Sequence, residues 1–363
     1  MVEFQSYSRD TREDKTEDAV LAKWIGKGHE HVFRDQRMKP AWEVTVLMQQ
    51  SSHTNWTIDV IFRGHHSLFD GMSGANFQKT LHKFLNQGSN LESFGLDEEW
   101  PVIIPSTIEL PFIIDVKKWK TVPWTPYPAT QPPAEDYVSR ARLVTIPYEH
   151  VQNILKYCRR LNTTVTGFLH SLLTIFSSRN SKKTSGIRAT TPFSLRGLTK
   201  LSVDELAMHV LWMKTLWPKS LVEPIRLAAE DSQEEELLVQ IARHFHAEID
   251  AELKRIPAGG GCAMIDLFKP ARAFGNEQIK MDYELSNIGV VKMLGNESPN
   301  CHLKLEKLAF TQCGMMDTDV GCSVATILGG PMVICLTWVG GAVEEQYIEK
   351  LSGYLEKKLI AIG

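Results

Sequence analysis

Two adjacent histidines lie at the centre of the stretch Arg63-Gly64-His65-His66-Ser67-Leu68-Phe69-Asp70-Gly71-Met72-Ser73-Gly74. Before it, residues 56–62 alternate apolar and polar side chains, which predicts a half-buried strand. After it, apolar residues recur at helical spacing from Phe77 to Leu85, which predicts a helix. The histidines therefore fall where a strand ends and the chain turns towards a helix. At such junctions a rigid element aims a reactive side chain while the turn leaves it accessible.

The spacing His65-His66-x-x-x-Asp70-Gly71 resembles the HHxxxDG signature of CoA-dependent acyltransferases with the chloramphenicol acetyltransferase-like fold. Within that superfamily the fungal alcohol acetyltransferases are most similar. Later segments support the resemblance, which extends from about residue 40 to the end: the Thr-rich turn at 162–166, the strand end at 191–196, residues 284–289 and the closing strand at 333–338. The resemblance implies an α/β (α+β) protein of two lobes. Mixed sheets would be flanked by helices, and an active-site channel would lie between the lobes.

The chain divides into three predicted parts. Residues 1–99 form an N-terminal lobe that carries the histidines, and this lobe is shortened relative to the family because only 64 residues precede His65. Part of it is then missing, rebuilt or supplied by another chain. Residues 100–136 are rich in proline, which lacks an amide donor, so an extended crossover linker is expected rather than a docking peptide. Residues 137–363 form the C-terminal lobe.

Periodicity predicts the remaining elements. Thr163 and Thr164 are expected to cap a helix that is apolar nearly all round and therefore central. The glycine-rich loop at 257–261 lacks the Gly-Lys-Ser/Thr ending of a phosphate-binding loop and is interpreted as a connector. The predicted strands are 42–47, 140–147, 187–192, 285–291, 307–311, 321–327 and 332–338, and the predicted helices are 148–161, 165–176, 232–255 and a last one after Gly341.

Charge and composition restrict the class of protein. The formal net charge of −3 offers no electrostatic case for binding nucleic acid or a membrane surface. The N-terminal region is polar and contains no secretory signal, and no apolar run reaches the length of a membrane span. The six cysteines form no CxxC pair, so reduced thiols in a cytoplasmic protein are expected.

The resemblance assigns the general base to His66. Transfer of an acyl group from a thioester to an alcohol requires a base for the hydroxyl, because the thioester is already activated whereas the hydroxyl is a weak nucleophile. Histidine has a pKa near neutrality, and a base so placed contributes about 10²–10⁴-fold to the rate. A hydrolase triad through Ser67 or Ser73 is disfavoured because no GxSxG turn is present.

The same resemblance implies supporting roles for neighbouring residues. Asp70 would pair with Arg196 and hold the loop in shape, and Gly71 would permit close packing at the start of the helix. Adjacent residues of an extended segment point to opposite sides, so His65 is expected to support the site rather than face the substrates. A metal site built from His65, His66 and Asp70 is the rival interpretation, and it fails because the two histidines diverge.

An oxyanion that develops in acyl transfer needs a hydrogen-bond donor, and Ser286 and Asn287 are the candidates. They are equally well interpreted as strand residues that cap a turn. The DFGWG segment of BAHD plant acyltransferases is absent, which favours the fungal group.

The resemblance therefore implies an acyl-CoA-dependent O-acyltransferase, with acetyl-CoA as co-substrate, no permanently bound cofactor and a small-molecule alcohol as acceptor. That alcohol would belong to secondary metabolism. One alternative is a non-catalytic or altered member of the same fold that serves in binding or assembly. A condensation-type enzyme using a carrier-protein thioester is the other, although no carrier domain is present in the chain.

Overall fold

The computed structural model describes most of the chain outside a few segments. The described residues are 2–6, 16–33, 40–50, 56–86, 137–180, 186–197, 202–227, 234–255, 280–293, 301 and 303–362. The predicted linker at 100–136 and the glycine-rich loop at 257–261 lie outside them.

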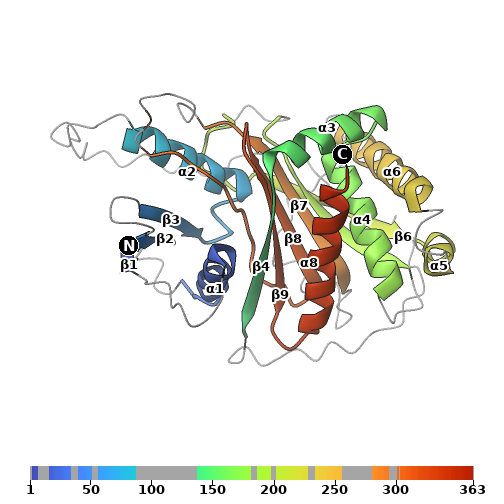
Figure 1. Ribbon diagram of the computed structural model, residues 1–363, viewed down its shortest axis with the longest axis horizontal. Helices are drawn as coiled ribbons and strands as arrows, with labels where there is room; N and C mark the ends of the chain where they lie inside the picture. Colours follow the sequence, from blue (N-terminus) through green and yellow to red (C-terminus); the bar gives the residue numbers. More distant parts are fainter. Residues whose placement is uncertain are drawn as a thin grey trace.

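A small three-stranded sheet comes first in the chain (Figure 1). β1 (Val2–Ser6) runs parallel to β2 (Trp42–Gln50), and β2 pairs antiparallel with β3 (Trp56–Gly64). The predicted strands at 42–47 and 56–62 are therefore confirmed. The predicted apolar face of β3 is less covered than expected, because Trp56 remains 52% exposed and Ile58 42% exposed.

Two helices accompany this sheet. α1 (Glu17–His29) begins at Thr16, whose hydroxyl accepts a hydrogen bond from the Ala19 amide, and it packs against the large sheet at β4. α2 (Gly71–Asn86) follows the histidine turn and lies against β3, where Phe77 stacks on Phe62.

The second sheet has six strands in the order β4-β9-β8-β7-β5-β6. β7 runs parallel to β5 and β8, whereas the other neighbours are antiparallel, so the sheet is mixed as expected. The strands are β4 (Ser139–Ile146), β5 (Ile187–Ser194), β6 (Val210–Trp217), β7 (Met281–Val291), β8 (Thr318–Ile327) and β9 (Met332–Val339).

Helices cover the face of the large sheet that is turned away from the small sheet (Figure 1). They are α3 (Tyr148–Arg160), α4 (Val165–Asn180), α5 (Lys219–Leu227), α6 (Glu234–Arg255) and α8 (Glu345–Ile360). α4 is buried continuously from Gly167 to Ser178, which confirms the predicted central helix, and Thr164 caps it by accepting the Gly167 amide at 3.0 Å. None of the described helices combines the length and apolar character needed to cross a membrane.

Four elements differ from the sequence-based expectation. β1, β6 and α5 are present although no strand or helix was predicted for them. The predicted strand at 307–311 is wrong: this segment is extended, but among the described residues it belongs to neither sheet. The apolar side chains of this segment line a cavity, which explains their pattern without a strand.

Candidate active site

A cavity of about 930 Å³ lies between the small sheet and the C-terminal part of the chain. One wall consists of β3, the histidine turn, and parts of α1 and α2. The other wall consists of residues 303–313 together with Ile288 of β7. This volume is typical of a site for a small molecule or cofactor.

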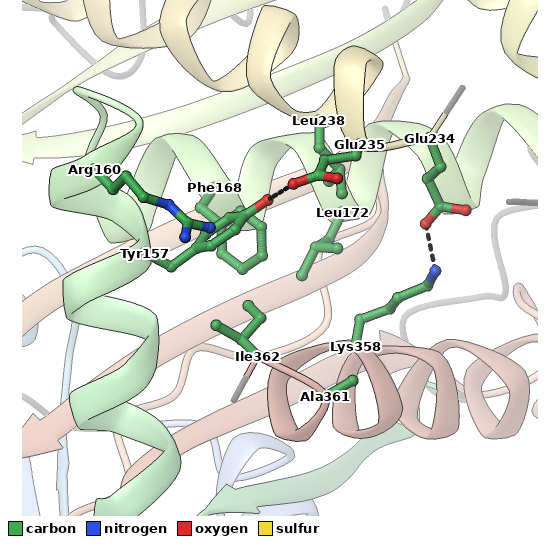
Figure 2. A pocket seen from close by; sticks show the side chains of 10 residues that line it. All are labelled: Tyr157, Arg160, Phe168, Leu172, Glu234, Glu235, Leu238, Lys358, Ala361 and Ile362. Carbon is green, nitrogen blue, oxygen red and sulfur yellow. Dashed lines mark hydrogen bonds and ion pairs between the residues drawn. The ribbon is translucent and has the colours of Figure 1, made fainter. Parts of the chain in front are cut away.

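A second, smaller cavity of about 320 Å³ lies on the helical side, where α3, α4, α6 and the end of α8 meet (Figure 2). Its polar side chains are largely paired with one another. Lys358 forms an ion pair with Glu234, and the Tyr157 hydroxyl donates a hydrogen bond to Glu235. Its lining contains no histidine or cysteine, so the larger cavity is the candidate active site.

His66 lies on the wall of the larger cavity, in the turn between β3 and α2. Its Nδ1 is 2.8 Å from the carbonyl oxygen of Phe69. A carbonyl only accepts hydrogen bonds, so Nδ1 carries the proton and Nε2 is left with a lone pair. The turn therefore holds the ring in the tautomer that a general base requires.

His65 also lies on the cavity wall, although it was expected to support the site rather than to face the substrates. The strand ends at Gly64 and the chain turns at His66, so the alternation of an extended segment no longer applies there. Nδ1 of His65 accepts the Ser67 amide at 3.2 Å and lies 2.7 Å from the Ser67 hydroxyl. Because Nδ1 accepts, the neutral ring has its proton on Nε2, which would face a ligand as a donor rather than as a base.

Asp70 is buried and caps α2. Its Oδ1 accepts the amide of Ser73 at 2.8 Å, which is the usual arrangement at the start of a helix. Its Oδ2 forms an ion pair with Arg196 and accepts the amide of His209 at 3.0 Å. The contact between Asp70 and Arg196, 126 residues apart, is therefore present in the fold.

The environment of Asp70 keeps the carboxylate ionised. Burial alone would raise its pKa, but the hydrogen bonds from Arg196, Ser73 and His209 and the charge of Arg196 outweigh burial and hold the pKa below its usual value. The guanidinium also donates to the carbonyl of Ala207 at 2.9 Å. This carboxylate is fully engaged by protein groups, so it acts on the shape of the loop and not on a ligand.

Gly71 leaves no room for a side chain. A Cβ there would lie 2.7 Å from ring atoms of Phe310 and 2.8 Å from Cγ2 of Ile288. The absence of a side chain thus lets α2 start directly against β7 and the 303–313 segment.

The two oxyanion candidates are not among the described residues that line the cavity. Asn287 donates from its amide to the Thr166 hydroxyl at 3.2 Å, and its Oδ1 accepts the Gly289 amide at 2.8 Å. Ser286 is buried in β7. The neighbouring Ile288 contributes the side chain that reaches the cavity, because the pairing of β7 with β8 is irregular between Asn287 and Val290.

Further polar residues on the wall were not identified from the sequence. His29, at the end of α1, is held by the Ser139 hydroxyl at 3.1 Å, and burial followed by the charge of Arg63 lowers its pKa to about 4. Gln312 donates to Glu284 at 2.9 Å, and burial raises the pKa of this carboxyl to about 7. No local pattern marks these residues, because each belongs to the site only through a contact with a distant segment.

Arg63 adds a positive charge to the wall near the histidines. It forms an ion pair with Glu43, which also lies 3.0 Å from His31, and it donates to the carbonyl of Gly28 at 3.2 Å. These contacts tie the end of β3 to β2 and to α1, so the strand that carries the histidines is anchored on both sides.

Comparison with known proteins identifies sequences and folds that resemble this chain. A sequence model of the family described as alcohol acetyltransferase matches residues 11–104, which contain the histidines, Asp70 and Gly71. The chain is also 25% identical over 372 residues to the probable alcohol acetyltransferase FCK4 of Fusarium pseudograminearum, covering 90% of this chain and 72% of that protein.

Solved structures share the fold at low identity. The trichothecene 15-O-acetyltransferase TRI3 of Fusarium sporotrichioides has a TM-score of 0.65 at 10% identity and covers 99% of this chain and 76% of that chain. TRI101 of Fusarium sporotrichioides, in a complex with coenzyme A and T-2, has a TM-score of 0.54 at 11% identity and covers 98% of this chain and 80% of that chain.

Fold and sequence therefore agree on the class. The protein has the two-lobed chloramphenicol acetyltransferase-like fold, and the predicted resemblance to alcohol acetyltransferases is confirmed. These similarities support an acyltransferase enzyme.

Proposed function

We propose that the protein transfers an acetyl group from acetyl-CoA to the hydroxyl of a small-molecule alcohol. The named activity of the relative FCK4 and the coenzyme A in the TRI101 complex support acyl-CoA as the donor. The trichothecene named for TRI3 supports a secondary metabolite as the acceptor. The cavity supports the same assignment, because apolar side chains such as Ile58, Leu81 and Leu305 line the cavity whose wall also contains the histidines.

His66 is the general base of this proposal. The observation that carries it is the hydrogen bond from Nδ1 to Phe69, which leaves Nε2 able to accept a proton. The acceptor oxygen attacks the thioester carbon while its proton moves to Nε2 of His66. The C–S bond then breaks, and His66 returns the proton to the departing thiolate, giving the acetyl ester and free CoA.

The neighbouring residues position His66. Asp70 and Arg196 hold the turn by pairing in the interior, and Gly71 allows the turn to approach Phe310. His65 contributes a donor at Nε2 rather than a second base. Ser286 and Asn287 flank Ile288, which lines the cavity. Alanine substitution of each residue tests whether it stabilises the oxyanion.

The proposed lobes follow the predicted boundaries: 1–99, the linker at 100–136, and 137–363. The small sheet (β1–β3) and the large sheet (β4–β9) support the first and last of these. The segment 303–313 passes beside β3, so the C-terminal lobe contributes one wall of the cavity. We place the protein in the cytoplasm, where acetyl-CoA is available.

The test is acetyl transfer by purified protein, measured as thiol release from acetyl-CoA across a panel of alcohols. His66→Ala is expected to lower kcat by about 10²–10⁴-fold because the base is removed. Its unfolding midpoint should match that of the parent, since His66 is exposed and packs little.

His65→Ala is the matched control, an adjacent imidazole on the same wall. It is expected to lose less than about tenfold, because a single hydrogen-bond donor of this kind contributes about 1 kcal/mol. Full activity in His66→Ala would refute the assignment of the base. A wild-type protein that releases no thiol with any alcohol would favour a non-catalytic member of this fold.

A further inference from the structure

The smaller cavity, among the helices that cover the large sheet, has an apolar floor. It lies where the ends of α3 and α8 meet the start of α6, on the face of the sheet turned away from the small sheet (Figures 1 and 2). Phe168 and Leu172 of α4 and Leu238 of α6 form the floor, and all three are buried. The volume of about 320 Å³ is at the lower end of the range for ligand sites. The floor therefore suits the apolar part of a small molecule.

Two of the charged side chains that line this cavity neutralise each other. Glu234 forms an ion pair with Lys358 at 2.7 Å (Figure 2), and it also accepts hydrogen bonds from Arg179 at 2.7 Å and from the Tyr354 hydroxyl at 3.2 Å. Burial alone would raise the pKa of Glu234, but the hydrogen bonds and charges of Lys358 and Arg179 outweigh burial and hold the pKa below its usual value. Glu234 thus stays ionised, and protein groups already engage it.

Arg160, at the end of α3, is different because no counter-charge holds it. Its guanidinium lies over the ring of Tyr157, 5.2 Å from the ring centroid (Figure 2), and it forms no ion pair within the described part of the chain. A cation–π contact uses the flat face of a guanidinium, so the N–H groups at its edge remain available. Glu235 is exposed and accepts only the long hydrogen bond of 3.5 Å from Tyr157. Arg160 is therefore placed to bind an anion at the edge of the apolar floor.

We propose that this cavity binds a small apolar monocarboxylate, with its hydrocarbon chain on the floor and its carboxylate on Arg160. A guanidinium binds a carboxylate through two parallel hydrogen bonds. The charges at the cavity favour a single negative charge on the ligand, because three cations oppose two carboxylates: Arg160, Arg179 and Lys358 against Glu234 and Glu235. A phosphate would bring a second negative charge towards the two glutamates.

This site is separate from the proposed function. None of the residues that line the smaller cavity lines the candidate active site. Binding of the carboxylate can therefore be measured without acyl transfer, and a protein that transfers no acetyl group would still bind it.

Octanoate is the probe for the test, and 1-octanol is the uncharged molecule with the same chain. Ligand-observed NMR titration of the full chain measures both affinities, with circular dichroism as the check on folding. The wild type is expected to bind octanoate with a Kd of about 0.1–1 mM, in keeping with the size of the ligand.

Arg160→Gln removes the charge at the edge of the cavity. It is expected to weaken octanoate binding by about 5- to 10-fold, the loss of a charge-assisted contact at an exposed position, and to leave 1-octanol unchanged. Arg159→Gln is the matched control, because Arg159 is an adjacent exposed arginine that does not line the cavity. It should leave both affinities unchanged.

Ala361→Phe places a ring in the cavity from its exposed side. It is expected to abolish the binding of both probes, because the ring occupies the space of the hydrocarbon chain. Ala361→Ser keeps the size of the side chain and should bind both probes as the wild type does.

Three results would overturn the inference. The first is a wild-type protein that does not bind octanoate. The second is octanoate binding that is unchanged in Arg160→Gln or in Ala361→Phe, because octanoate in the larger cavity would respond to neither substitution. The third is octyl phosphate that binds more tightly than octanoate and depends equally on Arg160, which would exclude a site selective for a monocarboxylate.

Discussion

The two sheets of this protein differ in how completely they are covered. In the large sheet every residue of β9 is buried, and helices α4 and α8 cover one of its faces. In the small sheet no residue of β3 is buried, and the strand lines the cavity. The difference separates two tasks. The large sheet provides the hydrophobic core, whereas the small sheet leaves side chains exposed on the cavity wall.

The Asp70–Arg196 pair joins the two regions and should show the largest effect on stability. Asp70→Asn or Arg196→Met is expected to lower the free energy of unfolding by about 3–5 kcal/mol, because each leaves a buried partner without its counter-charge. Urea unfolding measures the loss. Combining both substitutions should cost less than the sum of the two, and a strictly additive result would mean that the pair does not couple the regions.

The stability of the protein should fall strongly when a core side chain of the large sheet is truncated, and only slightly when a side chain of β3 is truncated. Leu336→Ala, at a fully buried position in β9, is expected to cost about 2–5 kcal/mol through lost burial and a residual cavity. Ile58→Ala on β3 should stay within about 0.5 kcal/mol because this side chain is already exposed. Thermal and urea unfolding of both variants compare the two regions, and similar losses would refute the division of tasks.

A buried histidine gives the large sheet its own dependence on pH. His170 donates to or accepts from Tyr283 at 2.9 Å and Thr191 at 2.8 Å, and burial lowers its pKa to about 3. The unfolded chain binds a proton there below about pH 6.5, whereas the folded chain stays neutral until about pH 3. The contribution of His170 is therefore complete above pH 6.5 and is lost as the pH falls.

His170→Gln isolates this effect from other titrating groups. The difference in unfolding free energy between wild type and variant should shrink by up to about 1.4 kcal/mol per pH unit between pH 6 and pH 4. Urea unfolding at several pH values measures the slope. A difference that is constant with pH would show that this imidazole titrates alike in both states.

The smallest effect on activity is expected behind the cavity wall. Ser286→Ala and Asn287→Ala should each lower kcat by less than about tenfold, because a residue outside the wall gives up at most one modest hydrogen bond of about 1 kcal/mol. Steady-state kinetics of acetyl transfer provides the measurement. A loss of about 10²–10³-fold would instead identify the oxyanion donor.

Local patterns in the sequence determined the elements with clear periodicity and their order. The alternation of 56–62, the helix after Asp70 and the apolar helix at 165–176 were predicted because burial repeats along each element at its own period. The spacing of His65, His66, Asp70 and Gly71 located the turn that carries the candidate base.

Only the tertiary structure decided which distant segments meet. It placed Gln312 on Glu284 and His29 beside Ser139, and it put both histidines on the wall of one cavity. Among the described residues it also left 307–311 outside both sheets, although its composition suits a strand. A strand needs a partner at hydrogen-bonding distance, and the availability of that partner depends on the packing of the whole chain and not on the residues of the segment.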